Sequence, residues 1–194
     1  YPVLGLLTAA RRSLGEGMTE ETLCSAMRLG SRNPLVERAR SDLGRFGMGL
    51  KTASFSQCRS LTVASKTAGG SVCVRRWDLD FLSANGTDRW LLLKTPNPGS
   101  EKHLSLLDDQ DSGTAVLLER LDRLVQGTDA DNTKHRDGFY STVGAIRAHL
   151  GMVFHRYLDG SKPPLRIYFN RTDPHGLVAP WDPFFEDHLA TQQL

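Results

Sequence analysis

Three glycines within six residues, Gly44, Gly47 and Gly49, form the stretch of this sequence best suited to binding an anion. Glycine tolerates positive φ angles and lets a ligand approach the backbone closely. A helical pattern follows at once, so free N–H groups and the positive end of a helix dipole would meet the ligand there. The pattern predicts a cradle for nucleotide phosphates, in which Lys51 adds a charge-assisted contact.

Two familiar phosphate loops do not fit this stretch. A P-loop requires a lysine directly after its last glycine, but Leu50 occupies that place and Lys51 comes one residue late. Both a P-loop and a dinucleotide-binding turn follow a buried strand, whereas residues 32–42 are polar. Thr52 also stands where a dinucleotide-binding turn would have glycine. For the glycine cluster taken alone, a turn that only caps a helix remains the alternative.

Two further glycine motifs flank this stretch and indicate its family. Gly15-Glu16-Gly17-Met18 precedes it, and Gly113-Thr114 opens an apolar strand pattern after it. A Gly-x-Gly-Met turn, a variable loop, a Gly-x-x-Gly-x-Gly helix start and a late Gly-Thr strand occur in this order. The chain resembles the GHKL (Bergerat-fold) ATPases, which include gyrase B, heat-shock chaperones, sensor histidine kinases and mismatch-repair ATPases. Within that superfamily it is most similar to the Microrchidia group and its bacterial relatives.

The resemblance runs from about Gly15 to the C-terminus, and it implies ATP and Mg²⁺ as cofactors. Gly15 and Gly17 would make room for the base, on which Met18 would pack, although a gap-filling core role is the alternative for Met18. Thr114 would lie near the adenine end. The residues implied to bind the nucleotide are Gly15, Gly17, Met18, Gly44, Arg45, Phe46, Gly47, Met48, Gly49, Leu50, Lys51 and Thr114. No metal ligand is identified in the chain.

The sequence departs from the family pattern before Gly15. Family members carry an upstream helix with a Glu that activates water and an Asn that holds magnesium. They also carry an Asp, two residues before the first glycine, that binds the adenine amino group. Here Ser13 stands at the Asp position, and no Glu or Asn precedes Gly15. The catalytic residue is therefore unassigned, although the resemblance implies ATP hydrolysis by the intact protein.

Two other functions remain open beside a hydrolysing ATPase. One is a degenerate nucleotide-binding scaffold without turnover, and the other is a histidine-kinase-type catalytic domain. The polar residues 31–42 are most simply interpreted as a solvated loop, but their place between two nucleotide-contacting turns suggests the mobile ATP lid of the family. The family also makes a nucleotide-dependent homodimer plausible by analogy, with DNA or a protein as client.

The order of the predicted elements indicates an α+β fold, in which a sheet carries helices on one face. The resemblance implies a two-layer α/β sandwich of the GHKL type, with a mixed, mostly antiparallel sheet. Thr19 is predicted to cap a helix that buries Leu23, Ala26 and Met27 and ends at Gly30. The other predicted elements are a short helix at 52–58, strands at 61–66, 72–77, 88–93, 104–107 and 113–119, a hairpin turn at 69–70, a long helix from 139 to 160, and a strand pair at 165–170 and 176–181.

The resemblance implies two domains. Residues 1–160 would form the ATPase domain, and residues 161–194 a strand pair that starts a transducer-like extension. Trp181, Phe184 and Phe185 would offer a docking surface there, or alternatively form a local end-of-domain cluster.

Composition sets limits on the partners of this 194-residue chain. The net charge of +2 does not argue for nucleic acid. No apolar run approaches the roughly 20 residues of a membrane span, so no membrane contact is predicted. Three cysteines without C-x-x-C spacing predict neither a zinc site nor a disulfide framework. ATP and ADP are the predicted small-molecule partners, and a cytoplasmic location with reduced thiols is expected.

Overall fold

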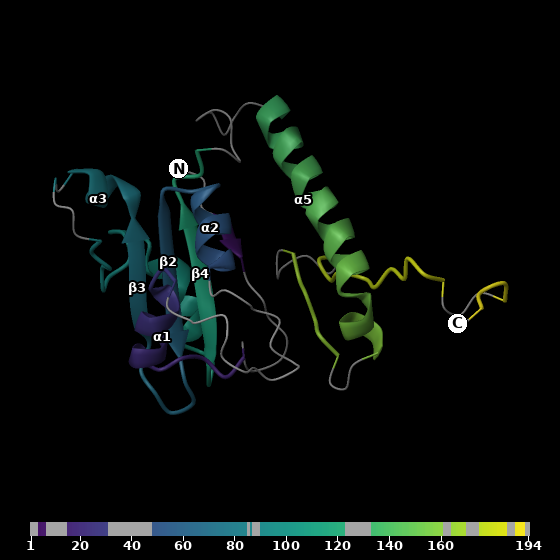
Figure 1. Ribbon diagram of the computed structural model, residues 1–194, viewed down its shortest axis with the longest axis horizontal. Helices are drawn as coiled ribbons and strands as arrows, with labels where there is room; N and C mark the ends of the chain where they lie inside the picture. Colours follow the sequence, from purple (N-terminus) through teal and green to yellow (C-terminus); the bar gives the residue numbers. More distant parts are fainter. Residues whose placement is uncertain are drawn as a thin grey trace. The chain divides into compact units, whose positions relative to one another are not determined.

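The computed structural model describes residues 4–6, 15–30, 48–84, 86, 90–122, 133–160, 164–169, 175–185 and 189–192. The chain divides into two compact units (Figure 1). The first comprises residues 1–6 and 11–128, and the second residues 7–10 and 129–194. The boundary expected between residues 160 and 161 stays a prediction.

A four-stranded sheet in the order β1-β4-β2-β3 forms the centre of the first unit (Figure 1). Its strands are β1 (Leu4–Leu6), β2 (Ser60–Lys66), β3 (Cys73–Asp78) and β4 (Gly113–Glu119), and every neighbouring pair is antiparallel. The predicted strands at 61–66, 72–77 and 113–119 are confirmed. The predicted hairpin is also confirmed, because β2 pairs with β3 through a turn in which Gly69 has φ +71° and Gly70 N donates to Thr67 O at 2.9 Å.

Helix α1 (Glu20–Met27) covers β3 on one face of this sheet. It begins as predicted, since the Thr19 side chain accepts a hydrogen bond from Thr22 N. Leu23 and Met27 are buried against the sheet, and Trp77 Nε1 donates to Met27 O at 2.9 Å. The prediction that Ala26 is buried is wrong, because the stripe defined by Leu23 and Met27 turns Ala26 towards solvent.

Helix α2 (Gly49–Phe55) covers β2, and it starts three residues before the predicted position 52. The core between the helices and the sheet is a single cluster of buried side chains: Leu23, Met27, Cys58, Leu61, Val63, Trp77 and Leu121. Partly buried Phe55 of α2 packs against it. The α+β fold with helices against an antiparallel sheet is therefore confirmed.

Two predicted strands need correction or restriction, and one helix was not predicted. Residues 104–107 are not a strand: α4 (Glu101–Leu104) continues into a 3₁₀ turn, η1 (Ser105–Leu107), and buries Leu104 and Leu107 at helical spacing. A short apolar run does not distinguish a strand from a buried helical turn. Of the predicted strand 88–93, Leu93 forms an isolated bridge with Arg76, while residues 87–89 lie outside the described part. Helix α3 (Leu79–Ala84) was not predicted.

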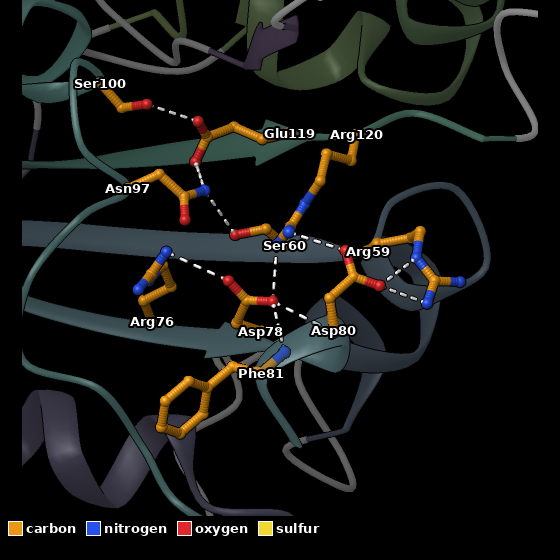
Figure 2. A network of polar contacts seen from close by, with 10 residues as sticks. All are labelled: Arg59, Ser60, Arg76, Asp78, Asp80, Phe81, Asn97, Ser100, Glu119 and Arg120. Atoms are coloured by element: carbon orange, nitrogen blue, oxygen red, sulfur yellow. Dashed lines mark hydrogen bonds and ion pairs between the residues drawn. The ribbon is translucent and has the colours of Figure 1, made fainter. Parts of the chain in front are cut away.

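The opposite face of the sheet carries a polar network (Figure 2). Ser60 lies directly across from Asp78 on β3 and from Glu119 on β4, so the three side chains share this face. The Glu119 carboxylate accepts hydrogen bonds from Ser100 Oγ at 2.5 Å and from Asn97 Nδ2 at 2.8 Å. Asn97 Nδ2 also donates to Ser60 Oγ at 3.1 Å. These bonds fasten the loop before α4 to the sheet.

Asp78 is the most heavily bonded carboxylate of the network. It accepts hydrogen bonds from the backbone N–H groups of Asp80 and Phe81, both at 3.1 Å. Its ion pairs are with Arg120 Nη2 at 2.6 Å and Arg76 Nη1 at 3.1 Å. Burial alone would raise the pKa of Asp78, but the Phe81 and Arg120 bonds outweigh burial and hold it below its ordinary value.

The second unit is built on α5 (Thr133–Val153), which begins six residues before the predicted start at Phe139. A π-helical turn, η2 (Arg156–Gly160), ends the helical region as predicted. The predicted strand pair is present as an isolated bridge between Tyr168 and Leu177. Gly151 faces this segment closely, because a Cβ there would lie 2.6 Å from Ala179 O.

We expect Asp78→Asn to lower the free energy of unfolding at pH 7 by about 1–3 kcal/mol, because buried Arg76 loses its charged partner and half-buried Arg120 loses one of its two. The substitution should also flatten the acid dependence of stability. In the wild type, the unfolded state binds the Asp78 proton first, so stability falls as pH drops from the ordinary value of 3.8 through the lowered folded pKa.

Urea unfolding at pH 7 and at steps between about pH 5 and pH 3 measures both effects. Asp109→Asn, at an exposed carboxylate, is the control and should change neither quantity. Equal slopes in wild type and Asp78→Asn would contradict the assignment of acid sensitivity to Asp78.

Candidate functional site

The turn at residues 15–18 lies against the start of β4 and the end of β2. Gly15 and Gly17 adopt φ angles of +91° and +73°, which favour glycine. A Cβ on Gly17 would lie 1.9 Å from Lys66 O, whereas a Cβ on Gly15 would meet nothing within 4 Å. Gly17 is therefore required by close packing as well as by conformation.

Buried hydroxyl groups join this turn to the Gly113-Thr114 pair. Met18 N donates to Ser65 Oγ at 2.8 Å, and Ser65 Oγ lies 2.7 Å from Thr114 Oγ1 and 3.0 Å from Gly113 O. Ser112 Oγ donates to Gly15 O at 2.7 Å. The structure thus brings together four residues that the sequence placed at the base end: Gly15, Gly17, Met18 and Thr114.

Ser65 and Ser112 were not among the predicted site residues. A signal for Ser65 is present in the sequence, because it occupies the face of β2 that Leu61 and Val63 bury in the core. A polar residue in such a position needs a hydrogen-bond partner. Its partners come from residues 47 to 49 positions away, and the strand pattern does not identify them.

The predicted phosphate segment is only partly described. Gly44, Arg45, Phe46 and Gly47 lie outside the described residues, as do Ser13 and the predicted lid at 31–42. The described part of the segment consists of Met48, Gly49, Leu50 and Lys51. Its first three residues are exposed at the beginning of α2, and a Cβ on Gly49 would meet nothing within 4 Å.

Lys51 has a different partner from the predicted phosphate. Its side chain is only 2% exposed, and its Nζ donates to Ala26 O at 2.6 Å and to Arg28 O at 2.7 Å. These carbonyls end α1, where a cation satisfies groups that have no partner within the helix. Burial lowers the pKa of Lys51. Lys51 therefore ties the end of α1 to the beginning of α2.

A hollow of about 450 Å³ lies beside Met18, between the first turn of α1 and the hairpin that joins β2 to β3. Arg75 and Glu20 line it and form an ion pair at 2.5 Å. The hydrogen bond and charge of Arg75 hold the pKa of Glu20 below its ordinary value. Glu20 is therefore ionised and engaged in a pair at neutral pH.

Within the described ranges, no group of three or more His, Cys, Asp or Glu side chains is arranged to hold a metal ion. The three cysteines are free, and burial raises the pKa of Cys58 to about 11. A search of the described helices finds none with the length and apolar character needed to cross a membrane.

Comparison with known proteins assigns the first unit to a family. The model of the family described as "Histidine kinase-, DNA gyrase B-, and HSP90-like ATPase" matches residues 14–114. No curated protein matches the chain. The matched range is more than half of the 194 residues, and it contains both glycine motifs and Thr114. On this match, and with an α+β fold in agreement, the chain belongs to the histidine kinase-, DNA gyrase B- and HSP90-like (GHKL) ATPase family.

Proposed function

We propose that this chain is the ATP-binding domain of a GHKL ATPase and acts as a nucleotide-dependent switch or dimerisation module. The observation that carries the proposal is the hydrogen-bonded junction of the 15–18 turn with Thr114 through Ser65. Two segments almost 100 residues apart, which open and close the family match, meet at that junction.

The base of the nucleotide would lie against the 15–18 turn. Gly17 cannot carry a side chain there, and Gly15 faces open space, so the backbone is accessible to a flat ligand. Met18 is half-buried and offers a polarisable apolar contact. Thr114, also half-buried, would present its hydroxyl to the adenine edge.

The phosphates would be bound by backbone amides of residues 44–51. Support comes from the exposed backbone at Met48, Gly49 and Leu50, where α2 begins without a side-chain cap. We assign Lys51 an indirect role, because its ammonium binds the end of α1. It would fix the start of α2, which binds the phosphates, relative to the 15–18 turn, which binds the base.

The proposal also includes more specific properties that the family resemblance implies. They are a relationship to the Microrchidia group, Mg²⁺ bound with ATP, hydrolysis by the intact protein, nucleotide-dependent dimerisation, a DNA or protein client, a cytoplasmic location, and a transducer-like extension from residue 161. Among the described residues, no group of three or more His, Cys, Asp or Glu side chains could hold Mg²⁺.

A second candidate is a nucleotide-binding scaffold that does not hydrolyse ATP. The environments of the three carboxylates near the 15–18 turn favour this candidate. Glu20 is engaged by Arg75, and Glu16 and Glu21 are exposed. We therefore expect none of these three to act as general base for water at the γ-phosphate.

Substitution at Gly49 tests the phosphate cradle. We expect Gly49→Val to abolish measurable ATP binding, because the added side chain would occupy the space that phosphate approaches. The fold should persist, since a Cβ at Gly49 meets no neighbouring atom. Isothermal titration calorimetry with ATP, on protein whose circular dichroism and melting temperature are unchanged, measures the effect.

The matched control is Gly144→Val on α5, where an added Cβ also meets nothing. It should bind ATP as tightly as wild type does. An unchanged affinity for ATP in Gly49→Val would show that the start of α2 does not bind the phosphates. A wild-type protein that binds no ATP would overturn the proposed function itself.

A turnover assay tests whether this chain itself supplies a general base. We predict that this 194-residue chain binds ATP but releases phosphate at the background rate, because a positioned general base contributes roughly 10²–10⁴-fold. A phosphate-release assay beside the binding assay makes the measurement. Rapid turnover that is lost in Glu16→Gln would contradict the prediction and identify Glu16 as the general base.

A further inference from the structure

Ser65 is a fully buried hydroxyl on the helix-covered face of β2, with 0% of its surface exposed. Hydroxyl groups are costly to bury unless they are hydrogen-bonded. Ser65 is bonded to three groups, and all of them belong to the base end of the proposed site: Met18 N, Gly113 O and Thr114 Oγ1.

The number of protons at Ser65 limits how these bonds are arranged. The hydroxyl has one proton to donate and two lone pairs, one of which accepts from Met18 N–H. Gly113 O is a carbonyl oxygen and can only accept, so the single Ser65 proton is used in the 3.0 Å bond to it. Thr114 Oγ1 therefore donates to Ser65 Oγ at 2.7 Å and turns its own lone pairs outward.

We infer that Ser65 is a positioning residue for base recognition: it holds the 15–18 turn in place and, by accepting the Thr114 proton, directs the lone pairs of the Thr114 hydroxyl towards the nucleotide. This inference rests on the proposed function. Without Ser65, Met18 N–H would lose its acceptor and the Thr114 hydroxyl would rotate freely. The base contact should weaken, while the phosphate contacts at α2 stay as they are.

The test compares two nucleotides that share sugar and phosphates but differ at the base edge. ATP carries the 6-amino group, and purine riboside triphosphate lacks it. We expect Ser65→Ala to weaken ATP binding about tenfold, the equivalent of one hydrogen bond of ~1.4 kcal/mol. The loss for the analogue should be smaller, so the ratio of the two Kd values moves towards one. Ser65→Thr, which keeps the hydroxyl, should give a ratio of the two Kd values close to that of the wild type.

Ser60→Ala is the matched control. Ser60 lies on the same strand, is also 0% exposed and has a hydrogen-bonded hydroxyl, but it faces the opposite side of the sheet. It should lower stability without changing the ratio. If Ser65→Ala does not fold, Ser65→Cys keeps the size of the side chain with a weaker hydrogen-bonding group, and its ratio should be intermediate.

The inference is overturned if the Ser65 variants bind ATP as wild type does, if both nucleotides weaken equally, or if Ser60→Ala changes the ratio to the same extent. Failure of wild type to bind either nucleotide would instead reject the proposed function, and the inference with it. The two failures are therefore distinguishable within one set of calorimetric titrations.

Discussion

The close approach of Gly17 to the backbone of Lys66 is the constraint on which the candidate site depends. No side chain fits between these two segments, because a Cβ would lie 1.9 Å from Lys66 O. That proximity brings Met18 N within reach of the adjacent Ser65, and through Ser65 it reaches Thr114. One steric requirement thus connects a turn near the start of the family match with the strand at its end.

A second connection relates the two sides of the site to each other. α1 follows directly from the 15–18 turn, and the buried ammonium of Lys51 joins its last carbonyls to α2. Desolvation disfavours the charged form of this lysine, and two short hydrogen bonds offset that cost. A shift of α2 would therefore move α1, and with it the 15–18 turn. The phosphates and the base of the nucleotide need not contact each other for this coupling.

The sequence predicted what local patterns determine. Thr19 and the glycine pair at 69–70 marked a helix start and a hairpin because capping and turn chemistry are local, and alternating apolar residues located β2, β3 and β4. Local patterns do not reveal a partner that is distant in the chain. Lys51 follows the glycines and was expected to contact phosphate, and the structure adds hydrogen bonds from Lys51 to carbonyls 23 and 25 residues earlier. Ser65 looked like an ordinary strand residue, and Leu104 and Leu107 fitted a strand as well as the helical turn they form.

Arg120 holds a left-handed backbone conformation, with φ at +57°, which is uncommon for a residue with a side chain. Its guanidinium pairs with Asp78 and Asp80, and its carbonyl accepts from Arg59 N. Replacement by glycine would relieve the backbone but leave a buried carboxylate short of a cation, and lysine would keep a charge without the planar fork. Neither substitution keeps the guanidinium ion pairs and also suits the left-handed backbone. A relative with another residue at position 120 is therefore expected to differ at Asp78 as well. The two positions are therefore expected to vary together among natural relatives of this protein.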